Sequence, residues 1–210
     1  MAEAIGDAPR QRILGAALEL MAEHGYEGMS LQQVADRVGL HKSSLFHHFP
    51  SKEELAREVF RGVAEELLKR VEPLLAEDPP RLESLLRAND ASVDHFAAEP
   101  AAARLLLRLM VTSRGERSGP FHTPPGEPDP IVQLLASLGR WLARARAAGV
   151  IRHVPVRHTV LNLMGLVLFY PGVAHHIPPS LLGADPRSAA MVDSRKRELR
   201  ALIAAALARR

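Results

Sequence analysis

Hydroxyl and basic side chains lie close together in one short stretch of the chain, which begins at Ser30. Ser30 and Gln33 have the spacing of a capping box, in which each side chain bonds the backbone N–H of the other at a helix start. Gly39 marks a sharp turn after that helix, and the apolar pair Leu45 and Phe49 predicts a second short helix. The first turn of this second helix is small and polar, with Lys42, Ser43 and Ser44.

These side chains suit contact with a nucleic acid. Small hydroxyl residues let a backbone approach base edges closely, and lysines reach phosphate oxygens. Two short helices at a steep angle, the second with a polar front, form a helix-turn-helix whose second helix enters the major groove. Lys52 stands where a further helix begins, and the N–H groups of a helix start also favour a phosphate. The same periodicity fits an ordinary helix pair in a bundle, so spacing alone leaves both interpretations open.

The order of residues separates the two interpretations. Residues from about 10 to 60 resemble the DNA-binding domain of TetR-family transcriptional regulators, in the consecutive stretches ILGAALELMAEHGYEGMS, LQQVADRVGLHKSSLFHHF and SKEEL. The resemblance covers about a quarter of the chain. It implies an N-terminal DNA-binding domain over residues 1–52, with the helix-turn-helix at about 30–49, and a C-terminal effector-binding and dimerisation domain over residues 53–210.

Taken position by position, the resemblance also assigns DNA contacts. The residues concerned are Gln32, Lys42, Ser43, Ser44, His47, His48 and Lys52. Two positions depart from the family pattern. Phe46 stands where the family usually has tyrosine, so a phosphate hydrogen bond from a phenol is lost. His41 stands where a serine commonly caps the recognition helix, so we expect that cap to be weaker or to come from elsewhere.

Apolar spacing predicts helices along the whole chain, and no strand-length alternation occurs. We expect an all-α protein with helices at residues 10–24, two short helices after residue 30, and a fourth from 52 to 68 or 77, with a kink or end near Pro73. Five more helices are expected at residues 81–98, 101–111, 131–148, 156–170 and 188–208. The proline-rich segments 112–130 and 177–186 are expected to be loops, the first of them mobile.

Composition limits the class of protein. The 210 residues are 47% hydrophobic and 24% charged, as in globular domains, and the absence of cysteine excludes disulfides and thiolate chemistry. No secretory signal is evident and the longest apolar run, 161–174, is short for a membrane span, so we expect a cytoplasmic protein. Residues 1–60 hold six basic and nine acidic side chains, so the net charge of +3 does not by itself indicate DNA binding.

The sequence contains little that would indicate an enzyme or a metal site. No GxSxG, GxGxxG or GxxxxGK[ST] motif occurs, so we expect neither an enzyme nor a cofactor. Adjacent helical residues point about 100° apart, so the pairs His47–His48 and His175–His176 are poorly placed to share one ion. The group His95, His175 and His176 is the one worth testing for a metal, and none is expected.

Isolated polar groups on apolar helices indicate where an effector could bind. Asn89 falls within an apolar stripe, and Asn162 is the lone polar side chain of its segment. A buried amide needs a partner, which is another side chain, a water or a ligand. The family resemblance implies a ligand cavity among these middle helices, so we predict a small, largely apolar effector. The predicted lining is Asn89, Phe96, Met110, Trp141, Asn162 and Phe169, although such stripes are also common in plain cores.

The last long helices carry more apolar surface than one chain can cover, which indicates a homodimer formed through about 156–175 and 188–208. Two copies would read the half-sites of a palindromic operator. We therefore expect a ligand-responsive DNA-binding regulator, a repressor, with no membrane association. The residues leave two alternatives open: a dimeric helical adaptor that does not bind DNA, and a small-molecule-binding protein without catalytic activity.

Overall fold

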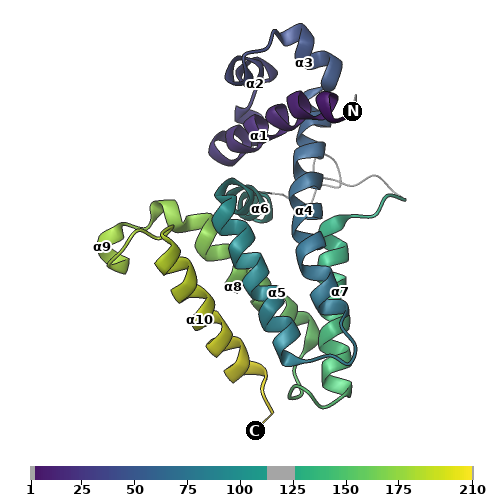
Figure 1. Cartoon of the computed structure of the whole chain (residues 1–210), viewed down its shortest axis with the longest axis vertical. Coiled ribbons are helices and arrows are strands. Elements are labelled where there is room, and N and C mark those ends of the chain that lie inside the picture. Colours follow the sequence, from purple (N-terminus) through teal and green to yellow (C-terminus); the bar gives the residue numbers. More distant parts are fainter. Residues whose placement is uncertain (1–2, 113–125, 210) are drawn as a thin grey trace. The chain divides into compact units, whose positions relative to one another are not determined.

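The computed structural model describes residues 3–112 and 126–209, and these form two compact units (Figure 1). Unit 1 comprises the described residues of Met1–Val63 and Arg104–Glu127, and unit 2 those of Ala64–Ala103 and Pro128–Arg210. The compact units therefore divide inside a helix, after Val63, whereas the sequence places the functional boundary after residue 52. That functional boundary stays a prediction.

Unit 1 contains three helices and parts of two more. They are α1 (Glu3–Gly28), α2 (Leu31–Val38), α3 (Lys42–His48), the first part of α4 (Lys52–Ala76), and α6 (Pro100–Thr112) from Arg104 onward. Gly25 interrupts α1 with φ +76°, so the regular helix stops at the glycine where the sequence predicts a stop. Arg104 bonds Glu19 at 3.0 Å and fixes α6 to α1 within this unit.

Unit 2 holds the remaining helices of the described chain. They are the rest of α4, the start of α6, α5 (Leu82–Ala98), α7 (Pro130–Ala147), α8 (Val156–Val173), the 3-10 turn Ala174–His176, α9 (Pro179–Leu182) and α10 (Ala189–Leu207). Helices α5 and α10 lie side by side and antiparallel, and α8 packs against both α5 and α7 (Figure 1). The all-α prediction is confirmed for the described residues.

Most predicted helix bounds lie within a few residues of the observed ones, because capping and turn residues mark them locally. Ser30 and Gln33 form the predicted capping box, with Ser30 N–H to Gln33 Oε1 at 2.8 Å and Gln33 N–H to Ser30 Oγ at 3.2 Å. Gly39 adopts the left-handed conformation, φ +70°, at the predicted turn. Pro73 does not end α4, which continues to Ala76.

Three predicted segments need correction or fall outside the structure. The expected loop 177–186 contains the short helix α9, because Pro179 suits a first helical position and Gly183 ends the turn. Helix α1 starts at Glu3, earlier than the expected residue 10. Most of the expected loop 112–130 lies outside the described residues, and the described part, 126–129, is not helical.

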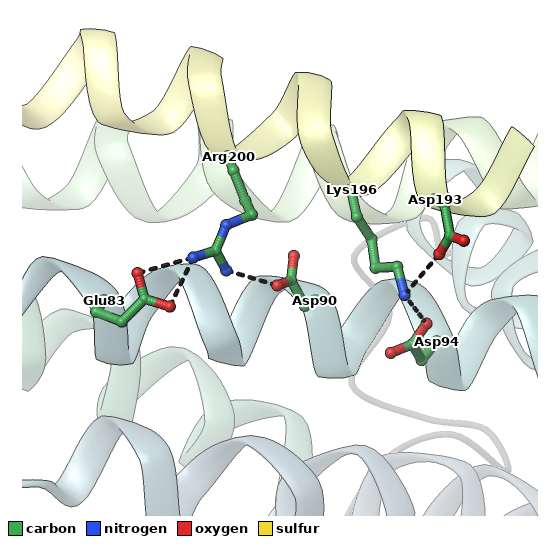
Figure 2. A network of polar contacts seen from close by, with 6 residues as sticks. All are labelled: Glu83, Asp90, Asp94, Asp193, Lys196 and Arg200. Atoms are coloured by element: carbon green, nitrogen blue, oxygen red, sulfur yellow. Dashed lines mark hydrogen bonds and ion pairs between the residues drawn. The ribbon is translucent and has the colours of Figure 1, made fainter. Parts of the chain in front are cut away.

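A row of ion pairs holds α10 against α5 (Figure 2). Arg200 of α10 contacts both Glu83 oxygens, at 2.6 and 2.7 Å, and Asp90 at 2.6 Å, all from one face of α5. Lys196 contacts Asp94 of α5 at 2.8 Å and Asp193 of its own helix at 3.2 Å. These hydrogen bonds, first those to Glu83 and Asp94, raise the pKa of Arg200 and of Lys196 respectively. Leu199, Ile203 and Leu207 of α10 are buried, and at about 100° per residue they lie on the same face of the helix as Lys196 and Arg200.

No helix in the described part of the chain has the length and apolar character required to cross a bilayer.

Candidate functional site

Helix α3 is fixed to the rest of unit 1 by Leu45 and by Phe49, which directly follows the helix. Leu45 and Phe49 are both 0% exposed. The Arg10 guanidinium lies 5.2 Å from the centre of the Phe49 ring, and Arg12 donates to the Val38 carbonyl at 2.7 Å. The helix is therefore held from behind, and its opposite face is left open.

The open face of α3 carries most of the predicted DNA contacts. At about 100° per residue, Ser43 and His47 point nearly opposite the buried Leu45, and both are exposed. Lys42 and His48 are also exposed and flank that line, while Ser44 is half-buried. The structure thus brings five of the predicted residues together on one short helix.

Phe46, at the position where the family usually has tyrosine, also lies on this face. Its ring is 43% exposed, and the Lys42 ammonium lies 5.8 Å from the ring centre. An exposed phenylalanine beside the polar front can contact a thymine methyl group in the major groove. The sequence already indicated that Phe46 is exposed, because the adjacent Leu45 is the residue that packs inward and neighbouring helical residues point about 100° apart.

The start of α3 has no side-chain capping bond from its N-cap residue, where the sequence predicts a cap that is weaker or comes from elsewhere. His41 occupies the N-cap position and makes no side-chain capping bond. Its carbonyl accepts the N–H groups of Ser44, at 2.9 Å, and Leu45, at 3.2 Å. The backbone alone therefore begins this helix.

The two predicted residues outside α3 already have partners. Gln32 on α2 donates to Asp36 at 2.7 Å and remains exposed. Lys52 at the start of α4 donates to the Glu27 carbonyl at 3.3 Å, and its ammonium lies 4.4 Å from the centre of the Tyr26 ring. A phosphate would have to compete with these contacts for Lys52.

Tyr26 and Glu53 complete a cluster around Lys52 that sequence reasoning missed. The Tyr26 hydroxyl donates to Glu53 at 2.7 Å, which lowers the pKa of Glu53. Burial, with this same hydrogen bond, raises the pKa of Tyr26. Because Tyr26 and Glu53 lie far apart in sequence, no local pattern announces their contact.

The six predicted effector residues separate into two groups. Asn89 and Phe96 on α5 and Trp141 on α7 are buried in unit 2. Met110, Asn162 and Phe169 are exposed. The premise that Asn162 is buried is wrong, because it lies on an open face of α8. The structure therefore does not bring the six residues into one interior, and their roles stay predictions.

Several buried polar atoms of unit 2 have no hydrogen-bond partner within the described residues. These are both amide atoms of Asn89, Oδ1 of Asp90, Nε2 of His95 and Nε1 of Trp141. Burial lowers the pKa of His95, and the nearby Arg70 reinforces this while Glu66 opposes it, which favours a neutral imidazole. An unpaired buried polar atom costs about 1–3 kcal/mol, so these atoms require an explanation.

An apolar groove runs between α8 and α10. It encloses about 200 Å³ and is floored mainly by Val154, Leu163, Leu166, Leu202, Ile203 and Leu207. Asn162 and His158 line it as well, on the face of α8 that also carries the exposed Leu161 and Phe169. These are helices of the predicted dimer surface.

The histidines considered for a metal are not gathered into a site. Among the described residues, no group of three or more histidine, aspartate or glutamate side chains could hold an ion. His175 and His176 are exposed, with ring centres 3.9 Å apart, whereas His95 is buried on α5.

Sequence comparison relates this chain to known regulators. Residues 13–59 match the family described as bacterial regulatory proteins, tetR family. The HTH-type transcriptional repressor KstR2 of Mycobacterium tuberculosis is 32% identical over 93 residues, which are 43% of this chain and 46% of that protein. The chain spans about half the length of the curated relatives that it matches.

Comparison of structures extends the similarity beyond the matched segment. The TetR family transcriptional regulator PfmR from Thermus thermophilus superposes with a TM-score of 0.69 at 25% identity, over 94% of this chain and 100% of that one. AibR, solved in complex with isovaleryl coenzyme A and operator DNA, superposes with a TM-score of 0.72 at 16% identity, over 92% of this chain and 97% of that one. The latter likeness concerns the fold alone.

Proposed function

Because the chain belongs to the tetR family of bacterial regulatory proteins through residues 13–59, we propose that it is a DNA-binding transcriptional repressor. The observation that carries the proposal is the open face of α3. Its Ser43 and His47 point away from the buried Leu45, with Lys42 beside them. This is the arrangement that a helix needs to place side chains against base edges in a major groove.

The repressor acts as a homodimer that reads a palindromic operator in the cytoplasm. The exposed apolar residues of α8 and α10, among them Leu161, Phe169 and Leu202, support the dimer, since large exposed apolar patches usually mark interfaces. Two copies of α3 then contact half-sites about one helical turn, roughly 34–36 Å, or a multiple of it apart.

A small molecule bound in unit 2 releases the repressor from DNA. Helix α4 supports this coupling because it starts in unit 1 at Lys52 and continues into unit 2. An effector that favours one position of α4 changes the separation of the two recognition helices. A coupling free energy of about 1–3 kcal/mol is typical and changes operator affinity markedly. AibR, which shares the fold, was solved with both a ligand and operator DNA.

The proposal is tested with duplexes selected by the purified protein from a randomised palindromic library. Lys42→Ala should weaken binding to every duplex and lower the slope of log affinity against log salt by about one per lysine removed. Ser43→Ala should instead change which duplex is preferred, because a base contact contributes about 1–3 kcal/mol of discrimination. Equal losses from both changes on all duplexes would contradict this division of roles.

A second lysine variant, Lys52→Ala, is compared with Lys42→Ala. It should weaken binding to all duplexes as well, but it also removes the contacts with Glu27 and Tyr26. Thermal unfolding of the same variant separates the loss of a phosphate contact from a loss of stability.

A second candidate function is a dimeric helical adaptor that binds a small molecule but no DNA. The acidic excess of residues 1–60 favours it, since a nucleic acid repels such a surface. A protein that dimerises yet shifts none of the duplexes, even at low salt, would support the adaptor. We propose no catalytic role for either candidate.

A further inference from the structure

We infer that the interior of unit 2 binds a neutral molecule whose apolar body carries a hydrogen-bonding group, with Asn89 as its main polar partner. The inference rests on the proposed function and names the chemical class of the effector. It starts from polar atoms that the described chain leaves unpaired, namely those of Asn89, His95 and Trp141.

The buried hydroxyl groups of unit 2 are paired within the chain. Ser92 donates to the Ala88 carbonyl at 2.9 Å, Thr159 to the Pro155 carbonyl at 3.0 Å, and Ser84 to Glu77 at 2.5 Å. Asn89 differs from these hydroxyl groups, because it is 6% exposed and neither its Nδ2 nor its Oδ1 has a partner among the described residues. A primary amide offers two donors and an acceptor, so one bound group can satisfy both ends.

The side chains around Asn89 indicate that the bound ligand is mostly apolar. Leu85, Val93 and Phe96 share its face of α5 at helical spacing, and all three are buried. The amide is therefore one polar point in an apolar wall. Such a wall binds an apolar body, and the amide fixes its orientation.

His95 and Trp141 add two further unpaired atoms. Arg70 and Glu66 of α4 act on His95 electrostatically. Trp141 lies one turn from Ser137, which bonds Glu72 of α4 at 3.3 Å. The indole N–H is a donor only, so its partner on the molecule must be an acceptor.

The neutral charge of the molecule follows from the kinds of group left unpaired. An amide, an indole and a neutral imidazole supply hydrogen bonds but no formal charge. Asp90, next to Asn89 in the chain, has its charge balanced by Arg200, which bonds Oδ2 at 2.6 Å, while its buried Oδ1 has no partner among the described residues and can accept a further hydrogen bond. An ionic ligand would lose its hydration here without meeting a free opposite charge. Carboxamides, ketones and alcohols with apolar bodies are neutral and carry a hydrogen-bonding group, so they meet these requirements.

The test uses Asn89→Leu, which keeps the side-chain volume and removes the polar atoms, in the full-length protein. Without any additive, Asn89→Leu should raise the Tm by roughly 2–4 °C, because the unpaired amide is removed. The matched control is Ser92→Ala on the same helix, which loses a satisfied bond and should not raise the Tm.

Two pairs of probes of equal shape test the chemical class: benzamide with cumene, and cyclohexanecarboxamide with isopropylcyclohexane. Each carboxamide should raise the Tm of the wild-type protein more than its hydrocarbon does. This advantage should vanish in Asn89→Leu and persist in Ser92→Ala. Trp141→Phe keeps an aromatic ring but removes the N–H, so it should reduce the Tm advantage of each carboxamide over its hydrocarbon. It serves as the second variant if Asn89→Leu does not fold.

The inference is overturned if Asn89→Leu folds but has a lower Tm than the wild type, since the amide then has a permanent partner such as a buried water. It is overturned as well if the hydrocarbons stabilise equally, or if no probe distinguishes the wild type from the variant. Gel shifts without additive keep the two proposals apart, because they measure DNA binding by the wild-type protein and do not depend on the probes. A wild type that binds no duplex but shows the expected Tm pattern would refute the repressor and leave the site standing.

Discussion

Individual side chains determine what the surface of α3 can offer to DNA. Lys42 and His47 are exposed, whereas Lys52 is held by the Glu27 carbonyl and lies over the Tyr26 ring. If Lys52 bound a phosphate, it would lose its contacts with the Glu27 carbonyl and the Tyr26 ring, and with them the stability that they contribute. At this scale the difference between two lysines of one motif comes from their partners rather than from their type.

His95 predicts a pH dependence of stability. Burial and Arg70 lower the pKa of His95, so the unfolded chain takes up this proton more readily than the folded one. The stability that His95 contributes by staying neutral should therefore be fully present above the ordinary histidine pKa of about 6.5. The free energy of unfolding should fall as the pH drops from there toward the lowered pKa. Replacement by phenylalanine, His95→Phe, removes this term.

Urea unfolding of both proteins between about pH 7.5 and 5.5 measures the effect, because histidine titrates in this range. One proton changes the slope by at most about 1.4 kcal/mol per pH unit. The neighbouring Glu66 and Arg70 are present in both proteins, so their own titration cancels in the comparison. Parallel pH profiles would show that His95 is not the source.

At the scale of helices, α2 and α3 are too short to be stable alone, with 8 and 7 residues. Their caps, turns and buried faces hold them. The Ser30–Gln33 capping box begins α2, and Gly39 ends it with N–H bonds to the carbonyls of Ala35 and Asp36. The geometry between the two helices therefore depends on a few local backbone features.

Gly39 and Gly62 form a matched pair for testing these features. A Cβ at either position would meet open space, but Gly39 has φ +70° whereas Gly62 lies inside α4. Gly39→Ala should lower the free energy of unfolding by about 1–2 kcal/mol, because an L side chain is strained in this conformation. Gly62→Ala should raise it by about 0.5–1 kcal/mol. Urea unfolding of both variants measures the contrast, and effects of the same sign would refute it.

The ion pairs between α5 and α10 predict a salt-dependent coupling of these helices (Figure 2). A double-mutant cycle with Arg200→Met and Glu83→Gln should give a coupling of about 0.5–1 kcal/mol, since the pair is partly exposed. The coupling should shrink in about 1 M salt. Lys69 and Glu66, 3.2 Å apart on one exposed stretch of α4, provide the control, with about 0.3–0.5 kcal/mol expected. A coupling no larger than the control would show that the row does not join the helices.

At the scale of the whole molecule, the exposed apolar side chains of α8 and α10 predict the dimer. Phe169→Asp places a charge on a residue that is 62% exposed, so the chain itself should still fold. A carboxylate buried without a partner opposes association, so the dimer dissociation constant should rise at least tenfold, about 1.4 kcal/mol. Sedimentation equilibrium measures this change.

Val132→Asp is the control, because Val132 is 61% exposed but lies on α7. It should leave the dimer intact. If Phe169→Asp remained dimeric as well, the interface would lie elsewhere. DNA affinity should fall with the dimer, since a single recognition helix contacts only one half-site.

Local signals in the sequence were enough to predict the long helices and the helix-turn-helix motif. The capping box at Ser30, the turn at Gly39 and the apolar pair Leu45 and Phe49 all act within a few residues, and each is found where expected. Their order was also enough to indicate the family. The start of α1 and the short helix α9 were missed, because their residues are weak or ambiguous helix signals.

Only the tertiary structure decided which of two similar residues is buried. Asn89 and Asn162 both lie on apolar helices, but α8 and α10 cover α5 while an outer face of α8 stays open. Likewise Lys52 meets Tyr26 because distant segments pack together. Helical periodicity records which residues share a face, yet burial depends on what other elements place against that face, and this information is spread over the whole chain.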